Sequence, residues 1–501
     1  MYEYALVVAL ATATQLSADS LEDSLAGKPP WRRLFLDAMV VEEQSKLSRV
    51  FHSARKYERN PVITKDKPWE GWGPYLYGTV MWDGGKLRMW YQCIEQGDRA
   101  CYAESSDGLR WMKPELNLVE FEGSKANNLF VEKNQCHIPS VIRVRDPKDP
   151  EQRWFMLCHG RQIGAHAAFS PDGLNWAWHE STSGKSLFET FDVINAFWDP
   201  YNQRYTATYK TVNRRHRAVG IALSEDGVTW TKPVQGAVFG ADDLDPDPTQ
   251  IYGMPVFPYQ GMYIGLPWIY HSRWIKYGKY TDPQVMYEAQ VGSPCTVDVQ
   301  MAWSWDLISW TRTPKREPFI ALGPAGSFDC CQIYTARAPV IVGDELWFYY
   351  GGFNKLHDQN SNTVGAIGLA KLRLDGFCSM RARSDEGWFI SRREVFRTPK
   401  VIINAATTAD GYVTAELLDR NNNVIEGFSR EECILFTGDS VRAELSWKTK
   451  AFSQEELSRD RKIRFYMKNA DLYSYLPADI DTSLDTGRAD YGVRVHQPRP
   501  R

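Results

Sequence analysis

A seven-residue phrase recurs along this 501-residue chain and constrains its fold more than any other feature. It reads Ser-x-Asp-Gly-x-x-Trp from Ser105, Ser170 and Ser224, and it returns from Ser304 with Leu307 in place of the glycine. Asp-Gly favours a tight hairpin turn, and tryptophan is favoured in the strand that follows. Because the turn recurs at the same position of each repeat unit, the sequence predicts several similar β units that stack on one another.

Each repeat unit also contains two apolar strands joined by a short polar turn. These hairpins span residues 75–91, 140–158, 193–209, 251–266 and 339–350, and a third strand such as 100–104 leads into the Asp-Gly phrase. Five four-stranded meanders predict an all-β fold, a five-bladed β-propeller over residues 55–396, because one blade cannot bury both of its faces alone. The alternative is a pair of β-sandwiches, but the regular spacing and the constant place of the turn favour the propeller.

The remaining segments differ in composition. Residues 397–477 alternate apolar and polar positions without the repeat phrase, which predicts a small β-sandwich domain, and the polar stretch 478–501 predicts a flexible tail. Residues 1–20 hold a short apolar stretch followed by small residues, a candidate signal peptide, and 21–54 form an N-terminal extension. The start of the chain lacks Lys and Arg, so an ordinary N-terminal helix or strand is the alternative. Export predicts a secreted or periplasmic protein that begins near residues 19–21, and the alternative predicts a cytoplasmic one.

Charge and motifs exclude several classes of function. The 59 Lys and Arg nearly balance the 62 Asp and Glu, so neither nucleic acid nor an anionic membrane is an expected partner. The phosphate-loop, dinucleotide, serine-hydrolase and zinc-protease motifs do not occur, and no Cys-x-x-Cys pair predicts zinc, so we expect no cofactor and no metal. Among the nine cysteines, Cys93 and Cys101 flank a short turn and can bridge facing strands in an exported protein.

The repeats and the closing domain resemble a known group of proteins. A five-bladed propeller with Ser-x-Asp-Gly-x-x-Trp turns and a C-terminal β-sandwich resembles the invertase-like and arabinanase-like glycoside hydrolases, and looks closest to a bacterial group called family 32-like. The resemblance covers about residues 55–475, including 102–115 and 468–473. It implies a glycosidase that acts on a polysaccharide or oligosaccharide. The Trp-Met-Asn-Asp-Pro segment of invertase-like enzymes is absent here, and residues 69–74 stand in its place.

Candidate catalytic residues follow from propeller geometry. The residues that open the first strand of each blade meet beside the axis, and carboxylates occupy most of these positions. Glycosidic cleavage needs one carboxylic acid to protonate the leaving oxygen and one carboxylate as nucleophile or base. We predict Asp192, Asp329 and Glu70 as the catalytic set, with the pKa of one member raised by its neighbours. The aspartates of the repeat turns are instead expected to hydrogen-bond their own loops.

Candidate substrate-binding residues lie at the same strand ends. They are Trp72, His137, Arg161, Lys210, Asp247, Gln250, Tyr252, His271, Gln332 and His357. Basic and amide groups there can hold sugar hydroxyls or an acidic sugar, and aromatic rings can stack on sugar faces. Two alternatives to hydrolysis stay open, a non-catalytic carbohydrate-binding propeller and a glycoside phosphorylase that uses Arg161, Lys210 and His271 for phosphate.

Overall fold

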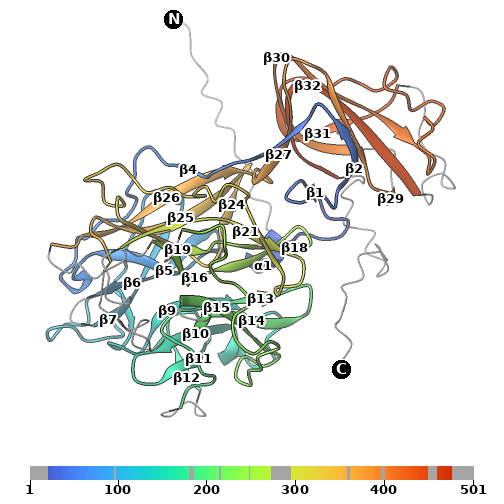
Figure 1. Cartoon of the computed structure of the whole chain (residues 1–501). Coiled ribbons are helices and arrows are strands. Elements are labelled where there is room, and N and C mark those ends of the chain that lie inside the picture. The colour runs from blue at the N-terminus through green and yellow to red at the C-terminus, as the bar shows by residue number, and fades with distance from the viewer. Residues whose placement is uncertain are drawn as a thin grey trace, which may run out of the picture.

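The computed structural model describes residues 21–94, 97–179, 185–213, 216–246, 249–271, 295–357, 362–395, 401–448 and 460–476 (Figure 1). In these ranges strands dominate, and the helical elements α1 (Leu21–Ala26), η1 (Pro68–Glu70) and η2 (Pro150–Gln152) are short. No helix in the described part is long and apolar enough to cross a membrane. The candidate signal peptide and the predicted tail lie outside the described residues. The all-β class predicted from the repeats is confirmed.

Three antiparallel sheets follow one another after the N-terminal extension. The first holds β5 (Pro74–Asp83), β6 (Lys86–Ile94), β7 (Asp98–Ser105) and β8 (Leu129–Val131). The second holds β9 (His137–Arg143), β10 (Trp154–Gly160), β11 (Gly164–Ser170) and β12 (Ala177–Trp178). The third holds β13 (Ile194–Asp199), β14 (Arg204–Asn213) and β15 (His216–Ser224). Strands that follow one another in the chain are neighbours in each sheet, which is the meander of a propeller blade.

The next group of strands is broken along its length. It comprises β16 (Thr249–Gly253), β17 (Val256–Tyr259), β18 (Met262–Gly265), β19 (Trp268–His271), β20 (Thr296–Val299), β21 (Ala302–Ser304) and β22 (Trp310–Arg312). Hydrogen bonds connect β16, β19 and β20 on one side of the breaks, and β17, β18, β21 and β22 on the other. Pro255 and Pro267 stand at two of the breaks, because proline has no N–H to donate to a ladder.

The last group closes a propeller-like ring. It comprises β23 (Gln332–Thr335), β24 (Val340–Val342), β25 (Glu345–Phe353) and β26 (Gly365–Arg373), and its outer strand is β4 (Arg55–Lys56) from the N-terminal side. The hydroxyl of Tyr349 on β25 donates to the carbonyl of Gly108 at 2.7 Å, so the last group of strands contacts the Asp-Gly turn of the first sheet. The propeller-like arrangement predicted from the repeats is confirmed.

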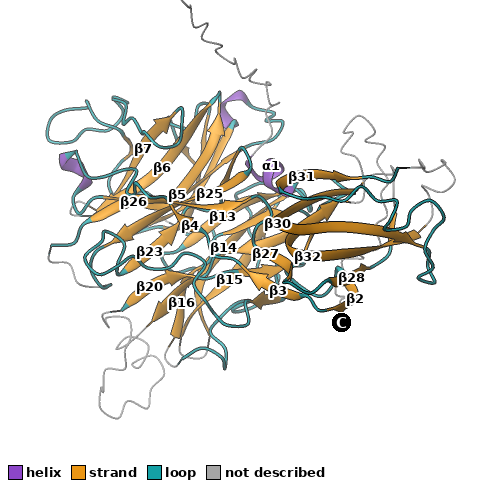
Figure 2. Ribbon diagram, turned by 90° about the horizontal axis from the view of Figure 1, so that it is seen from above, coloured by secondary structure: helices purple, strands orange, loops and turns teal. Residues whose placement is uncertain are grey.

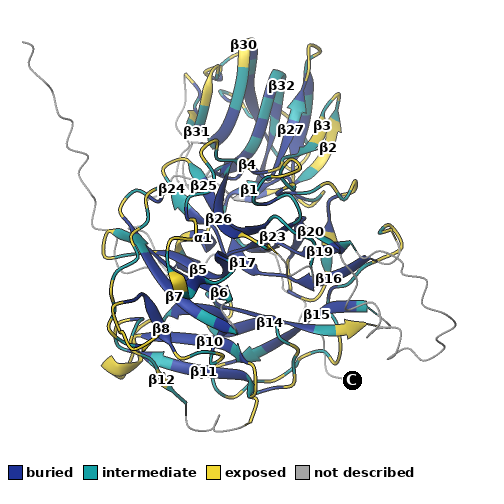
Figure 3. Ribbon diagram, turned by 90° about the vertical axis from the view of Figure 1, so that its left-hand side faces the viewer, coloured by how far each residue is buried: buried dark blue, intermediate teal, exposed yellow. Residues whose placement is uncertain are grey.

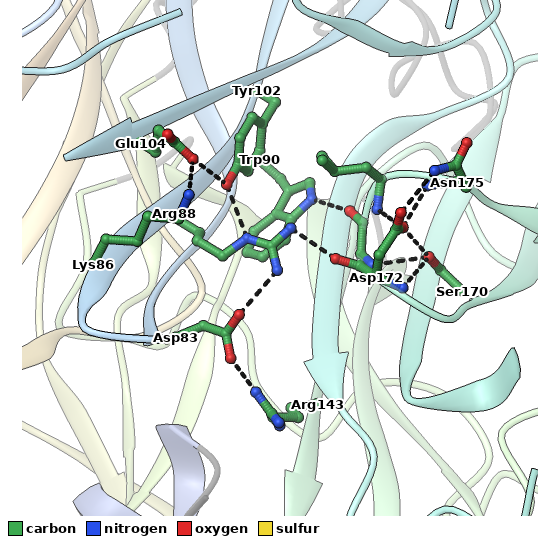
Figure 4. Close-up of polar contacts among 12 residues, drawn as sticks. Asp83, Lys86, Arg88, Trp90, Tyr102, Glu104, Arg143, Ser170, Asp172 and Asn175 are labelled. Atoms are coloured by element: carbon green, nitrogen blue, oxygen red, sulfur yellow. Dashed lines mark hydrogen bonds and ion pairs between the residues drawn. The ribbon is translucent and has the colours of Figure 1, made fainter. Parts of the chain in front are cut away.

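The Asp-Gly turns connect neighbouring sheets. In the turn after β11, Asp172 Oδ1 accepts the N–H groups of Leu174 and Asn175, both at 2.8 Å (Figure 4). From β6 of the preceding sheet, Arg88 donates to the carbonyl of Asp172 at 2.8 Å and Trp90 to that of Gly173 at 2.7 Å. The aspartate therefore shapes its own loop, as predicted, and presents the loop carbonyls to the preceding sheet.

The C-terminal part forms a nine-stranded sheet (Figures 1 and 2). It contains β1 (Arg33–Leu34), β2 (Val41–Ser45), β3 (Ser48–Phe51), β27 (Cys378–Ala382), β28 (Gly387–Ser391), β29 (Glu394–Val395), β30 (Val401–Leu418), β31 (Asp439–Leu445) and β32 (Asp460–Leu476). The predicted limits at 54 and 396 do not coincide with this sheet. It takes β1 to β3 from the predicted extension, and β27 to β29 from the last residues of the predicted propeller range.

Buried polar contacts join the two parts. Asp375, which is 1% exposed, accepts hydrogen bonds from Tyr259 and from Ser474 on β32, both at 2.7 Å. Arg32 approaches the same carboxylate at 3.5 Å. Figure 3 shows that the strands of the ring are largely buried while exposure gathers in the connecting loops.

The N-terminal helix closes one end of the ring. Glu22 of α1 is fully buried and forms an ion pair with Arg337, which is 1% exposed. Arg337 also donates to Thr79 of β5 and to the carbonyl of Val141 of β9, both at 3.1 Å. The ion pair therefore lies among the innermost strands, because β5 and β9 are the first strands of their sheets.

Candidate functional site

A cavity of about 260 Å³ opens at the end of the ring away from α1. Its lining is Trp72, Tyr75, Tyr77, Ile94, His137, Arg161, Asp192, Tyr252, Gln332, Tyr334, Phe353, Leu356, His357 and Thr363. The first strands β5, β9, β16 and β23 each contribute to this lining, and Asp192 lies two residues before the first strand β13. The innermost strands therefore bring their opening residues to one axial pocket, which is the geometry that the sequence predicts.

The cavity is blind. Tyr77 stacks on Trp268 with ring centroids 5.2 Å apart, and Tyr334 meets Tyr77 edge-on at 4.7 Å, so three buried rings form a floor. Two residues further along β5, Thr79 accepts a hydrogen bond from Arg337, and Arg337 forms the ion pair with Glu22. Among the described residues, the rings and this ion pair therefore close the axis on the far side of the cavity.

Asp192 is the carboxylate that the cavity exposes. Its side chain is 33% exposed, and its oxygens lie 2.6 Å from Nζ of Lys210 and 3.5 Å from a guanidinium nitrogen of Arg161. Arg161 in turn forms an ion pair with Asp98, a residue of β7 that is 3% exposed. Nδ1 of His137 lies 3.3 Å from the same Asp98 carboxylate. The site is thus a chain of alternating charges, with Asp98 behind Arg161 and Asp192 in front of it.

The charges keep both carboxylates ionised. Burial alone would raise the pKa of Asp192, but the charges of Lys210, His137 and Arg161 outweigh it and hold that pKa well below its usual range. Burial opposes ionisation of Asp98 as well, and His137 and Arg161 again hold its pKa well below the usual range. Asp192 is therefore not a member of the predicted set whose pKa is raised, because the charged groups nearest to it are cations rather than other carboxylates.

The pKa of Lys210 is also lowered, which for a lysine favours the neutral form. Its side chain is 4% exposed, and burial lowers its pKa to about 8, although the ion pair with Asp192 works against this shift. The ammonium lies 3.7 Å from the ring centre of Tyr252, and the guanidinium of Arg217 lies 5.5 Å from the same centre. The contact favours the charged form of both partners, but burial outweighs it for Lys210, which is less exposed than Asp192.

Two of the predicted catalytic carboxylates do not line the cavity. Glu70 is fully buried, accepts a hydrogen bond from Tyr91 at 3.0 Å and forms an ion pair with Lys113 at 2.6 Å. Asp329 is 3% exposed and holds Lys56 of β4 at 2.6 Å and the hydroxyl of Tyr350 at 2.8 Å. Both lie a few residues before a first strand, but their partners come from neighbouring loops and strands, so each holds a local contact and does not line the cavity.

The predicted binding residues divide in a similar way. Trp72, His137, Arg161, Tyr252, Gln332 and His357 line the cavity, and Lys210 supports Asp192 from behind. Gln250 is fully buried and accepts the N–H of Arg217 at 3.2 Å, and His271 pairs with Asp298 at 2.8 Å, so neither is in the lining. Asp247 lies outside the described residues.

Asp98 was not predicted from the sequence. It opens β7, the third strand of its sheet, whereas the predicted site residues lie near the openings of first strands and the ends of second strands. The small residue Gly97 before it, at φ 137°, is the local signal of a tight turn that delivers Asp98 to the site. Among the described residues no group of three His, Cys, Asp or Glu side chains is arranged to hold a metal ion.

No family model matches the chain, and no curated protein matches it by sequence. Solved structures with a similar fold include a glycosyl hydrolase from Bacteroides ovatus, at 17% identity over 65% of this chain and 94% of that one, with a TM-score of 0.43. A GH32 β-fructofuranosidase from Bombyx mori is 14% identical over 86% of this chain and 95% of its own, with a TM-score of 0.37. An α-L-arabinofuranosidase from Podospora anserina is 11% identical over 65% and 98%, with a TM-score of 0.43. These similarities concern the fold, and the chemistry of the site rests on the residues of this chain.

Proposed function

We propose that this protein is a glycoside-hydrolase-like protein that holds the terminal sugar unit of an oligosaccharide or polysaccharide in the axial cavity and cleaves the bond next to it. The observation that carries the proposal is an ionised, partly exposed carboxylate, Asp192, in a blind cavity with aromatic walls. Aromatic faces stack on sugar rings, and a carboxylate with an arginine beside it matches the hydroxyl groups of a sugar.

The size of the cavity supports a single-unit site. About 260 Å³ is below the roughly 300–1,000 Å³ of pockets that hold drug-sized ligands. A blind cavity of this size receives the end of a chain and stops it at the floor of Tyr77, Trp268 and Tyr334. We therefore propose that units are removed from a chain end.

The ionisation of Asp192 fixes the role proposed for it. Glycosidic cleavage uses one carboxylate as nucleophile or base and one protonated group as acid. Asp192 is held ionised, so it suits the first role and not the second. Glu70 and Asp329 are not carried into the proposed catalytic set, because neither lines the cavity.

A second candidate is carbohydrate binding without cleavage. One observation favours it: Asp98 and Asp192, the two carboxylates of the site, are both held ionised, so neither supplies the proton that the leaving oxygen needs. Such a site would bind the same chain ends and release no product.

The test is product release from a panel of oligosaccharides, run with and without inorganic phosphate and analysed by mass spectrometry. We expect single units to be released by water, and Asp192→Asn to lower turnover about 10²–10⁴-fold. Asp172→Asn, in a turn far from the cavity, is the matched control and should keep the turnover of folded protein. Release that depends on phosphate would indicate a phosphorylase, and binding with no product would favour the second candidate. Full activity of Asp192→Asn, or cleavage inside long chains, would contradict the proposal.

A further inference from the structure

Two cysteines meet behind the wall of the cavity. Cys93 on β6 and Cys101 on β7 are both fully buried, and their sulfur atoms lie 2.8 Å apart. The register pairs Tyr91 with Cys101 and Cys93 with Arg99, so the two cysteines are diagonal neighbours on one face of the hairpin. A disulfide has an S–S length of about 2.05 Å, so closure needs the sulfurs to approach by less than about 1 Å.

We propose that Cys93 and Cys101 are a covalent cross-link site that forms an intrachain disulfide when the protein folds in the presence of a disulfide oxidant. With glutathione disulfide as oxidant, the thiolate of one cysteine attacks a sulfur of the oxidant and expels one glutathione thiolate. The thiolate of the second cysteine then attacks the protein sulfur of this mixed disulfide and expels the other. The two cysteines lose two protons and two electrons, and one glutathione disulfide becomes two glutathione molecules.

The cross-link would stabilise the hairpin that carries part of the site. Ile94, next to Cys93, lines the cavity, and Asp98 on β7 holds Arg161 and His137. Gln92, on the other side of Cys93, donates to the carbonyl of Cys136 at 3.0 Å and accepts the N–H of Ile138 at 2.8 Å. A bond between β6 and β7 therefore ties two pocket-forming segments together across the turn between them.

Burial determines when the bond can form. Both sulfurs are inaccessible in the folded protein, and burial raises the pKa of the Cys101 thiol well above its usual value. The thiolate that must attack the oxidant is therefore scarce once the sheet has closed. We expect the reaction to take place during folding, and a protein folded as the dithiol to resist later oxidation.

The chain provides an internal comparison. Cys330 and Cys331 also have their sulfurs close together, at 3.2 Å, but they are adjacent in sequence and belong to one half-buried segment before β23. A bridge between adjacent residues closes a small strained ring, so proximity alone should not link them. We therefore predict a cross-link between Cys93 and Cys101, and none between Cys330 and Cys331.

The experiment refolds the full chain from denaturant in excess glutathione disulfide, and in parallel in reduced glutathione. Free thiols are alkylated in denaturant, and the protein is digested with trypsin. Cleavage after Arg88, Arg99 and Arg110 puts Cys93 and Cys101 on separate peptides, 89–99 and 100–110. We expect the oxidised sample to yield these peptides linked and two hydrogen masses lighter than the two free-thiol peptides, and the reduced sample to yield both alkylated.

The reduced wild type is the reference, so the outcome does not depend on a variant that folds. Cys93→Ser should abolish the linked peptide and leave Cys101 alkylated. Recovery of both peptides in alkylated form from the oxidised, folded sample would overturn the proposal. A link from Cys93 or Cys101 to any other cysteine in that sample would overturn it as well.

Discussion

At the scale of single residues, the site depends on where charge can be held. Asp192 stays ionised because the cations Lys210 and Arg161 lie beside it. Burial lowers the pKa of Lys210 to about 8. The ion pair between Asp192 and Lys210 is therefore lost at low pH when Asp192 is protonated, and at high pH when Lys210 is deprotonated. Asp192 would lose its charge only in strong acid, whereas Lys210 loses its proton around pH 8.

The first prediction concerns this alkaline limit. Above about pH 8, neutral Lys210 no longer holds Asp192, so affinity for sugar should fall along a limb centred near that pH. Lys210→Arg should move the limb to higher pH, because the guanidinium stays protonated. Binding measured by calorimetry from pH 5 to 10 checks this, and an identical limb in Lys210→Arg would contradict it.

The free energy of unfolding should depend on pH in the opposite direction to the affinity for sugar. The folded-state pKa of Lys210 lies below the unfolded value of about 10.4, so between about pH 8 and 10.4 the unfolded state binds more protons. This group alone should make the free energy of unfolding rise with pH across that window. Asp192 has a folded pKa below its unfolded value, so its contribution is present above about pH 4 and is lost as the pH falls further. Denaturant unfolding of the wild type and Lys210→Met between pH 7 and 10 should show a steeper rise in the wild type, and equal slopes would contradict the assignment.

At the scale of elements, the repeated turn is an inter-sheet contact. The guanidinium of Arg88 lies 4.8 Å from the ring centre of Trp90 and 4.9 Å from that of Trp154. It donates to Tyr102 and Asp83, and to the carbonyl of Asp172 in the next sheet (Figure 4). The turns that carry Gly108 and Asp172 are therefore each hydrogen-bonded to the sheet before them in the ring.

We predict that Arg88→Met destabilises the protein by about 2–3 kcal/mol, because hydrogen bonds to a charged group are lost and buried acceptors remain. The cavity lies elsewhere on these strands, so product release or sugar affinity per folded molecule should be unchanged. Thermal unfolding and the assay of the proposed function measure the two effects. An unchanged melting temperature would contradict the inter-sheet role, and a large loss of activity in folded protein would connect this contact to the site.

At the scale of the whole molecule, the N-terminal residues complete two structures that begin elsewhere in the chain. β4 is the outer strand of the last sheet of the ring, β1 to β3 belong to the C-terminal sheet, and Glu22 closes the axis against Arg337. The stability of the ring should therefore depend on a segment that carries none of the repeat.

Glu22→Gln tests this dependence. It leaves the guanidinium of Arg337 buried without its carboxylate, which typically costs about 3–5 kcal/mol. Glu58→Gln, at an exposed position of the same N-terminal segment, is the control and should change stability little. Denaturant unfolding measures both variants, and equal stabilities would contradict the closing role of α1.

Local patterns explain what could be predicted from the sequence. The Asp-Gly turns, the hairpins and the convergence of His137, Asp192, Tyr252 and Gln332 follow from a repeat and from strand order, which the sequence displays directly. Asp98 beside Arg161, or Glu22 beside Arg337, depends on contacts between segments that no local pattern connects. The partners of Glu70 and Asp329 could not be predicted for the same reason, because a position near the start of a strand does not reveal which lysine will pair with the carboxylate.

The most direct test of the account is a crystal structure of the protein with an oligosaccharide that it binds or cleaves. We predict one sugar unit in the axial cavity, stacked against its aromatic wall and within hydrogen-bond distance of Asp192 and Arg161, with the rest of the oligosaccharide leaving through the open end. A second groove of about 250 Å³ lies where β3 meets the ring, lined in part by Phe51, Met301 and Phe319. Sugar bound in that groove, with the axial cavity empty, would contradict the account.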